Sequence, residues 1–277
     1  MQHPSLPAAL VLSDRRMCLA ALLFGLACVS AGAQGITLTL RTERPELVMG
    51  EPLLVEVTAL NNSGRDVLIR NDWESPNRFL IAPDGTRTPL VPPAHVGDWG
   101  YFLRKIAVGT KESLYFVVPE IANVKRPGQY RLVMEYEDLN ASGEVAFVVK
   151  PYDQGALRAR ASQLYQSATA TQLSVYRPGA SARHADYDLG DSALAAVDPT
   201  VAKPFLCNLM KLNSPTAAIP RLEQIGDEES VQCLIDAFPA AKGDLRDLLD
   251  GTLVRLLRTL PDGETKDNVK RALGRRP

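Results

Sequence analysis

The sequence predicts two parts, an antiparallel β-sandwich followed by an all-helical region. Three observations favour this multi-domain β + α fold class. Apolar and polar residues alternate between residues 34 and 150, as they do in strands with one buried face. After Pro151 the apolar period lengthens to about 3.6 residues, and Ala, Leu, Gln and Arg replace Val and Thr. Clusters of Gly, Pro, Asn and Asp separate the strand-like runs and are typical of tight turns.

The first 33 residues have the pattern of a secretory signal peptide. Two arginines precede an apolar run over residues 17–29, and small residues follow it as far as Ala33. The run has about 13 residues, too few to cross a bilayer as a helix. We therefore expect cleavage after Ala33, a bacterial periplasmic or secreted location, and no membrane span. Gly25-Leu26-Ala27-Cys28 loosely resembles a bacterial lipobox, so a lipid anchor on Cys28 is the alternative fate.

Residues 34–150 predict a sandwich of short strands. Asn61-Asn62-Ser63-Gly64 and Pro83-Asp84-Gly85-Thr86 supply hairpin turns, because Asn and Gly accept a positive φ. So many short strands in so short a segment are typical of two packed sheets. We expect them at residues 36–41, 54–60, 66–70, 79–82, 101–108, 113–118, 130–136 and 144–149.

Two segments in this part resemble the immunoglobulin-like sandwiches common in exported bacterial proteins. They are Gly50-Glu-Pro-Leu-Leu-Val-Glu-Val-Thr-Ala-Leu-Asn-Asn62 and Arg126-Pro-Gly-Gln-Tyr-Arg-Leu-Val-Met-Glu-Tyr136. The resemblance implies that the Pro-Gly turn opens a late strand whose tyrosine, here Tyr130, docks against a neighbouring corner. Because this part contains no cysteine, Val, Leu and Ile must hold the sheets together in place of a core disulfide.

Residues 151–277 predict helices. Asp153 can cap a first helix that runs to about residue 170, and residues 177–190 predict a surface loop. Turns then recur at Val197-Asp198-Pro199, Ile225-Gly226-Asp227-Glu228 and Leu260-Pro261-Asp262-Gly263. Residues 219–238 resemble a HEAT or armadillo-type repeat, in which one helix ends at a turn and an Asp caps the next. Residues 193–212 and 245–273 resemble further units of such an array. The irregular spacing leaves a generic helical bundle as the alternative.

Cys207 and Cys233 lie on two helices that would stack in adjacent units. An oxidising periplasm favours a disulfide, which requires Cα atoms within about 7 Å. Stacked helix axes lie about 8–10 Å apart, so only cysteines that face each other would reach. A disulfide and two buried thiols therefore both remain open.

Composition and motifs argue against several activities. Lys and Arg total 31 against 32 Asp and Glu, which leaves no excess positive charge for a nucleic-acid partner. His95 and His184 fall in different predicted parts, and no Gly-x-Ser-x-Gly or glycine-rich phosphate loop is present. We expect no catalytic site, no metal and no cofactor.

Aromatic residues in two predicted loops are the candidate binding residues. Residues 89–100 contain three prolines, His95 and Trp99, and Trp73 follows the third predicted strand. Aromatic side chains on a rigid loop contribute strongly to binding interfaces. The alternative is that Trp73 and Trp99 plug an end of the sandwich.

The sequence therefore favours an exported noncatalytic module that binds or scaffolds an unknown protein partner. Both resembled folds usually work by presenting surfaces. One alternative is a secreted protease inhibitor in which residues 91–99 fill a protease cleft. Another is an enzyme with an unrecognised site, which would have a polar cleft lined by His184.

Overall fold

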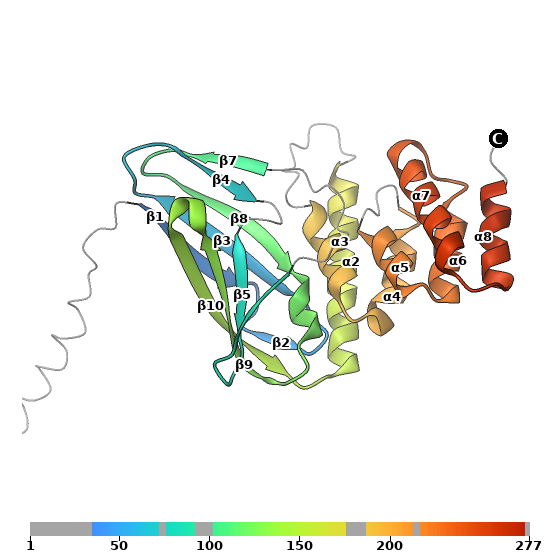
Figure 1. Cartoon of the computed structure of the whole chain (residues 1–277), viewed down its shortest axis with the longest axis horizontal. Helices are drawn as coiled ribbons and strands as arrows, with labels where there is room; N and C mark the ends of the chain where they lie inside the picture. Colours follow the sequence, from blue (N-terminus) through green and yellow to red (C-terminus); the bar gives the residue numbers. More distant parts are fainter. Residues whose placement is uncertain (1–34, 72–75, 92–101, 176–186, 213–216, 275–277) are drawn as a thin grey trace, which may run out of the picture. The chain divides into compact units, whose positions relative to one another are not determined.

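The computed structural model describes residues 35–71, 76–91, 102–175, 187–212 and 217–274. In these ranges the last strand ends at Lys150 and the first α-helix begins at Gln154. This confirms the predicted order of a β part and a helical part (Figure 1). All described residues belong to one compact unit, Gly35–Pro277. The predicted signal peptide lies outside the described residues.

The strands form three sheets. A three-stranded antiparallel sheet has the order β1 (Ile36–Thr42), β3 (Leu53–Asn61), β8 (Lys111–Val118). A five-stranded sheet has the order β2 (Glu46–Val48), β10 (Ala141–Lys150), β9 (Gly128–Tyr136), β5 (Asn77–Ile81), β6 (Arg87–Pro89). In it β2 and β10 are parallel and the other pairs are antiparallel. A two-stranded sheet pairs β4 (Val67–Asn71) with β7 (Phe102–Ile106). The sequence reasoning missed the short strands β2 and β6, which alternation over three residues cannot reveal.

Alternation along the strands places one face of each sheet in the sandwich core. In β3 every second residue from Leu53 to Asn61 is buried, and the same pattern brings Leu132, Met134 and Phe147 into the core. The sheets approach each other closely at Gly143 of β10. A Cβ there would lie 2.5 Å from Leu40 Cδ1 and 3.2 Å from Leu38 Cβ, so glycine fits where a larger residue would push β1 away.

Asn61 connects the three-stranded sheet to the β4–β7 ribbon. Its side chain is fully buried, and its Nδ2 donates to the carbonyls of Ile106 and Arg65, each at 2.9 Å. Its Oδ1 accepts from the backbone N–H of Ser63 at 2.9 Å and from the Ser63 hydroxyl at 2.6 Å. The buried amide is thus satisfied on both ends and shapes the turn between β3 and β4.

Among the described residues, seven α-helices follow the sheets. Two short 3-10 helices, η1 (Pro119–Asn123) and η2 (Glu137–Leu139), precede them. The helices are α2 (Gln154–Val175), α3 (Tyr187–Ala196), α4 (Pro199–Leu209), α5 (Ala218–Ile225), α6 (Glu228–Ala237), α7 (Gly243–Thr259) and α8 (Glu264–Gly274). The first helix extends past the predicted end near residue 170. The predicted loop over residues 177–190 is wrong from residue 187 onward, because α3 begins at Tyr187 and buries Gly190 against Ala168 of α2.

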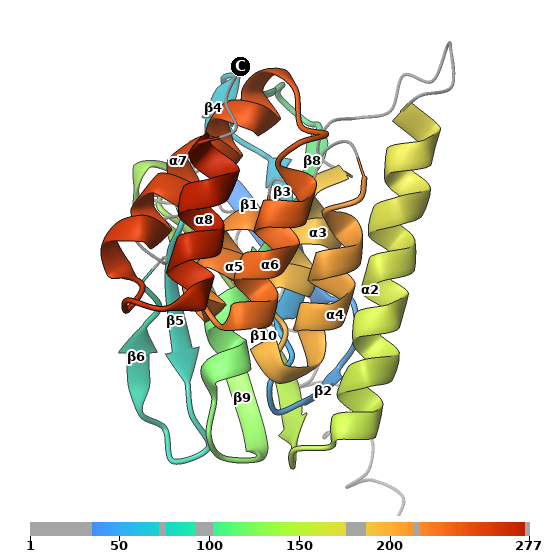
Figure 2. The same ribbon diagram turned by 90° about the vertical axis from the view of Figure 1, so that its right-hand side faces the viewer.

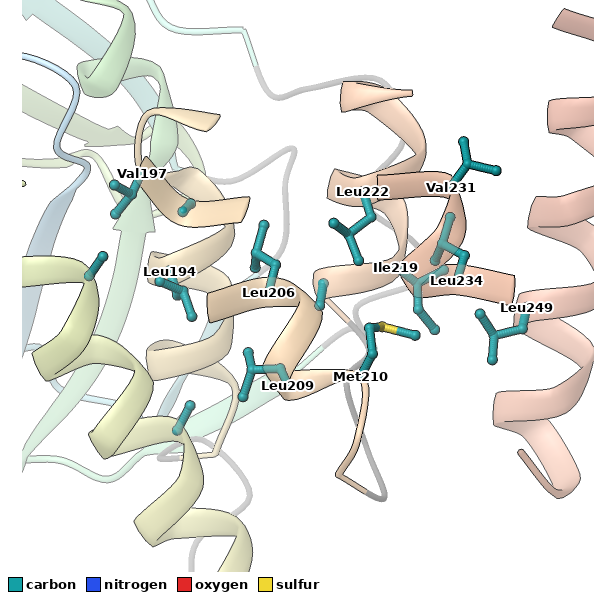
Figure 3. Packing of buried hydrophobic residues seen from close by; sticks show 14 of the residues in the cluster. Leu194, Val197, Leu206, Leu209, Met210, Ile219, Leu222, Val231, Leu234 and Leu249 are labelled. Carbon is teal, nitrogen blue, oxygen red and sulfur yellow. The ribbon is translucent and has the colours of Figure 1, made fainter. Parts of the chain in front are cut away.

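The helices after α2 pack as three consecutive pairs, α3 with α4, α5 with α6 and α7 with α8. The first members contact each other in the order α3, α5, α7, and the second members in the order α4, α6, α8. Helix α2 lies alongside α3 and α4 (Figure 2). Buried Leu, Ile and Val side chains form a continuous apolar core from Leu194 through Leu206 and Leu234 to Leu249 (Figure 3). No helix among the described residues combines the length and apolar character that a membrane span needs.

Replacing Gly143 by Val is expected to lower the free energy of unfolding by about 1–3 kcal/mol, because the added side chain overlaps Leu40 and Leu38. Urea denaturation followed by circular dichroism measures the change. Ser142→Val is the matched control, since Ser142 is exposed on the same strand. Equal midpoints for the two variants would contradict the close approach of β1 and β10.

Candidate functional site

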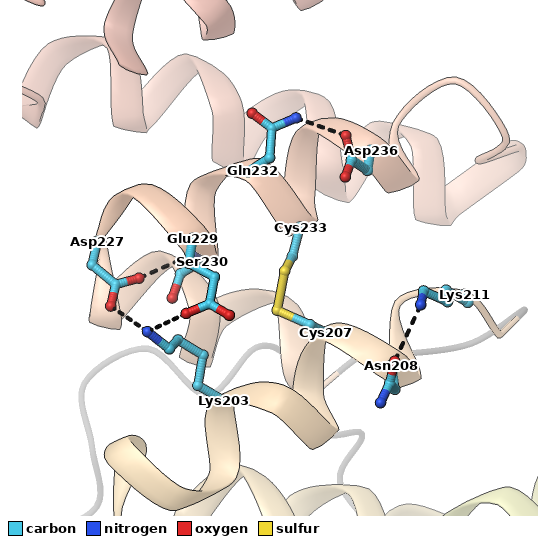
Figure 4. The surroundings of a disulfide bond; sticks show 10 residues. All are labelled: Lys203, Cys207, Asn208, Lys211, Asp227, Glu229, Ser230, Gln232, Cys233 and Asp236. Atoms are coloured by element: carbon cyan, nitrogen blue, oxygen red, sulfur yellow. Dashed lines mark hydrogen bonds and ion pairs between the residues drawn. A yellow bond between two sulfur atoms is a disulfide. The ribbon is translucent and has the colours of Figure 1, made fainter. Parts of the chain in front are cut away.

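The structure brings together one of the two groups of residues that the sequence singled out. Trp73, His95 and Trp99 lie outside the described residues. Cys207 of α4 and Cys233 of α6 form a disulfide, with Cα atoms 5.4 Å apart (Figure 4). The two cysteines face each other across adjacent helix pairs, which is the arrangement that the sequence alone left open.

Aspartate caps fix where the two bridged helices begin. The Asp198 carboxylate accepts from the backbone N–H of Thr200 at 2.9 Å, and α4 starts there. The Asp227 carboxylate accepts from the backbone N–H of Ser230 at 2.9 Å, and α6 starts there. Such caps satisfy backbone donors that a helix leaves without partners in its first turn.

Lys203 forms a second tie between α4 and α6, one helical turn before the disulfide (Figure 4). Its Nζ lies 2.8 Å from Asp227 Oδ2 and 2.7 Å from Glu229 Oε2. Lys203 and Cys207 are four residues apart on α4, as are Glu229 and Cys233 on α6. Residues at this spacing share one helix face, so α4 and α6 are held at two successive turns along matching faces.

Lys203 and Asp227 each shift the pKa of the other in the direction that favours its charged form. Hydrogen bonds to Asp227 and Glu229 raise the pKa of Lys203. Burial works to raise the pKa of Asp227, but the bonds from Lys203 and Ser230 outweigh it and the pKa is lowered. Both shifts favour the charged forms, so the pair remains ionised across the neutral pH range.

The surface around the disulfide carries both polar and charged exposed side chains. Pro204 and Asn208 of α4 and Gln232 and Asp236 of α6 point to solvent, and with the disulfide they form what we term the α4–α6 ridge. Lys211 Nζ donates to Asn208 Oδ1 at 3.2 Å, and Gln232 Nε2 donates to Asp236 Oδ1 at 2.7 Å. The ridge offers amide groups and a proline on a stiff base, which suits hydrogen bonding to a partner surface.

The other helix layer is tied by an arginine. Arg255 of α7 makes two hydrogen bonds to the Glu223 carboxylate of α5, from Nε at 2.7 Å and from a terminal nitrogen at 2.8 Å. Asp191 of α3 accepts from the backbone N–H of Ala217 at 3.1 Å, just before α5 begins. Polar contacts therefore link neighbouring pairs in both layers.

A network of charges with a buried centre lies between the sheets and α2, and the sequence reasoning missed it. Arg160 of α2 binds both carboxylate oxygens of Glu43, and its Nε lies 3.3 Å from Glu51 Oε1. Arg44 also pairs with Glu51, whose Oε2 accepts from the backbone N–H of Val48 at 3.2 Å. The side chains of Glu51 and Arg160 are only 2% and 7% exposed. Burial, and then the nearby charge of Arg160, lower the pKa of Arg44.

One signal in the sequence could have revealed Arg160. The buried face of α2 carries Leu157, Ala161 and Leu164, and position 160 belongs to the same face. A charged residue on an apolar face indicates a buried partner, because an unpaired buried charge is strongly unfavourable.

A second buried pair lies on the inner side of the five-stranded sheet. Arg78 of β5 has a terminal nitrogen 3.9 Å from Glu120 Oε1 of η1. Burial lowers the pKa of Arg78 and raises that of Glu120, so for each residue desolvation outweighs the opposite charge nearby. Among the described residues, no group of three or more His, Cys, Asp or Glu side chains is arranged to hold a metal ion.

Comparisons with known proteins add little to this geometry. No model of a protein family matches the chain, and no curated protein matches it. A β-glucosidase from Erythrobacter marinus is 13% identical with a TM-score of 0.29, over 40% of this chain and 15% of that chain. A β-glucosidase from Listeria innocua is 19% identical with a TM-score of 0.28, over 41% and 16% of the two chains. The CARDB domain of the PF1109 protein from Pyrococcus furiosus is 12% identical with a TM-score of 0.25, over 42% and 87%.

The matched region therefore spans about a sixth of the length of these β-glucosidases. At such TM-scores the likeness assigns neither a fold family nor an activity to this chain.

Replacing both Cys207 and Cys233 by Ser is expected to lower the free energy of unfolding by about 2–4 kcal/mol, because the crosslink constrains the unfolded chain. Urea denaturation with and without dithiothreitol measures the effect. The reductant should lower the midpoint of the native chain and leave that of the double variant unchanged. A native midpoint that does not respond to full reduction would contradict the prediction.

The lowered pKa of Asp227 predicts how the stability of the chain changes in acid. Its folded pKa is below the unfolded value of about 3.9, so its contribution to stability is present above that pH and is lost as the pH falls through the folded pKa. Asp227→Asn should therefore be less stable than the native chain at pH 7, by on the order of 0.5 kcal/mol for a partly exposed pair. The difference should shrink below about pH 4. Thermal melts of the native chain and of the variant between pH 2 and 7 measure it. A constant difference for Asp227→Asn would contradict the ion pair.

Proposed function

We propose that the chain is an exported, noncatalytic protein-binding or scaffolding module, in which an immunoglobulin-like sandwich carries a HEAT-like helical array. The observation that carries this proposal is the double tie between α4 and α6. The disulfide and the Lys203 contacts hold successive helix pairs in register, and the ridge above them stays open to solvent. A stiff, exposed surface binds a partner at a low cost in conformational entropy.

The sheet order supports the immunoglobulin-like interpretation. One sheet has the order β1-β3-β8 and the other has a parallel β2 beside β10, followed by β9 and β5. The Tyr130 hydroxyl at the start of β9 donates to the carbonyl of Arg126 at 2.8 Å. A tyrosine that bonds back to the backbone a few residues upstream is the tyrosine corner of such sandwiches.

The pairwise packing of the helices supports the HEAT-like interpretation. Each pair contacts the next pair in the order of the chain, and the first and second helices form separate layers. Helical arrays bury their core by this kind of stacking and need polar terminal units. Helix α8 fits this requirement, because it buries Val269 while Asp267, Lys270 and Arg271 point to solvent.

The disulfide also supports export. Disulfides persist in the periplasm and outside the cell and are rare in the reducing cytosol of mesophilic bacteria. Half-buried cysteines that face each other on different helices would form this bond in an oxidising compartment.

Export is tested by expressing the full chain in a bacterial host beside a variant that lacks residues 2–33. The full chain should be recovered from the periplasm, shortened at Ala33, with Cys207 and Cys233 protected from alkylation. The variant should remain in the cytosol with both thiols reactive, as mass spectrometry after alkylation would show. A full chain that stays in the cytosol at its full mass would overturn export.

Binding is tested with a paired substitution on the ridge. Asn208→Arg together with Gln232→Arg should abolish the recovery of proteins that crosslink to the native chain in periplasmic extract. Thr39→Arg, at an exposed position on the outer face of β1, should retain them. If the ridge variant and the Thr39 variant recover the same proteins as the native chain, the ridge is not the binding surface.

A further inference from the structure

We propose that Glu43, Arg44, Glu51 and Arg160, here named the junction network, form a latch that fixes the orientation of the helices against the sheets. Loss of the latch would leave both parts folded but able to move relative to each other. The latch operates whether or not the α4–α6 ridge binds a partner.

The network joins segments that are far apart in the sequence. Glu43 and Arg44 follow β1, Glu51 lies between β2 and β3, and Arg160 is on α2. Arg160 contacts both carboxylates, and Arg44 contacts Glu51 from the other side. The two positive and two negative charges alternate along the chain of contacts. Each charged group therefore has a neighbour of opposite sign, and the network as a whole has no net charge.

Burial of Glu51 and Arg160 points to a role in orientation, while the side chains of Glu43 and Arg44 reach the edge of the junction and are 47% and 39% exposed. Removing charges from water costs several kcal/mol per ion, and their mutual attraction offsets this only where the geometry is good. An apolar junction of similar size tolerates sliding, because hydrophobic contact has no direction. A guanidinium held by two carboxylates has well-defined hydrogen-bond directions. The network therefore favours one docking angle over its neighbours.

The two parts have separate cores, so the latch is not needed to keep either of them folded. The buried apolar residues form one cluster within the sheets and another within the helices. Between these clusters Val48, Leu54 and Val117 are only partly buried against the helical core. The covalent connection is short and exposed, from Pro151 to Asp153 between β10 and α2. Such a connection can serve as a hinge when the contacts across it are lost.

Gly50 completes the latch beside Glu51. Its carbonyl accepts from the backbone N–H of Asp198 at 2.8 Å, at the start of α4. A Cβ at Gly50 would lie 3.1 Å from both Asp198 Cβ and Leu157 Cδ1, and its φ of +94° favours glycine. The turn that carries Glu51 can therefore approach both α2 and α4 closely.

The test measures distances between spin labels on the two parts. Labels are placed at Thr39→Cys on β1 and Asp247→Cys on α7, both exposed, in a full chain with Cys18 and Cys28 replaced by Ser. The native chain should give one narrow distance distribution. Arg160→Met should broaden it about twofold while the circular dichroism of sheets and helices is retained. Glu43→Gln, which removes one carboxylate from Arg160 and keeps its shape, should give a smaller broadening.

Arg158→Met is the matched control, because Arg158 is exposed two residues earlier on α2. Its distribution should equal that of the native chain. An unchanged distribution in Arg160→Met would overturn the latch. Unfolding of both parts in Arg160→Met and in Glu43→Gln would also overturn it, since the network would then belong to a single cooperative core.

Discussion

Pairing of the buried Arg160 guanidinium is the constraint on which the arrangement of the molecule depends. A guanidinium remains charged, so its burial requires carboxylates at fixed positions. Glu43 and Glu51 meet this requirement from two separate connections of the sandwich. The face of α2 that carries Arg160 together with Leu157, Ala161 and Leu164 must therefore meet both the two carboxylates and the helical core. Only a narrow range of rotations about its axis satisfies both conditions.

The position of α2 also determines where the first of the following helix pairs lies, because α2 packs against α3 and α4. Helix α2 lies on α3 and α4, and Gly190 of α3 approaches so closely that a Cβ would be 2.9 Å from the Ala168 backbone nitrogen. Contacts between side chains then set each later pair against the one before, through Lys203 and the disulfide in one layer and through Arg255 and Glu223 in the other. The step from the first to the second pair is thus fixed between α4 and α6, and the step from the second to the third pair between α5 and α7.

Local patterns predicted much of this fold from the sequence, whereas contacts between distant segments remained hidden. Alternation over β3 and β9 and the Asp227 cap depend on neighbouring residues, so periodicity and capping chemistry were sufficient to predict them. The turn between β3 and β4 depends on the buried Asn61 amide, which donates to the carbonyl of Ile106 in the neighbouring β4–β7 ribbon. The network depends on Glu43 and Arg160, 117 residues apart. Whether Cys207 and Cys233 face each other depends on how α4 and α6 are rotated about their axes. The spacing of the two cysteines in the sequence does not determine that rotation.

The two ends of the stack of helix pairs differ in what covers them. At one end the apolar sides of α3 and α4 are covered by α2, which also packs toward the sheets through Arg160. At the other end α8 exposes Arg271 and Lys270, which pairs with Asp267, so covering this face would remove charged groups from water. The side of the stack formed by α4 and α6 exposes Pro204, Asn208 and Gln232 beside the disulfide.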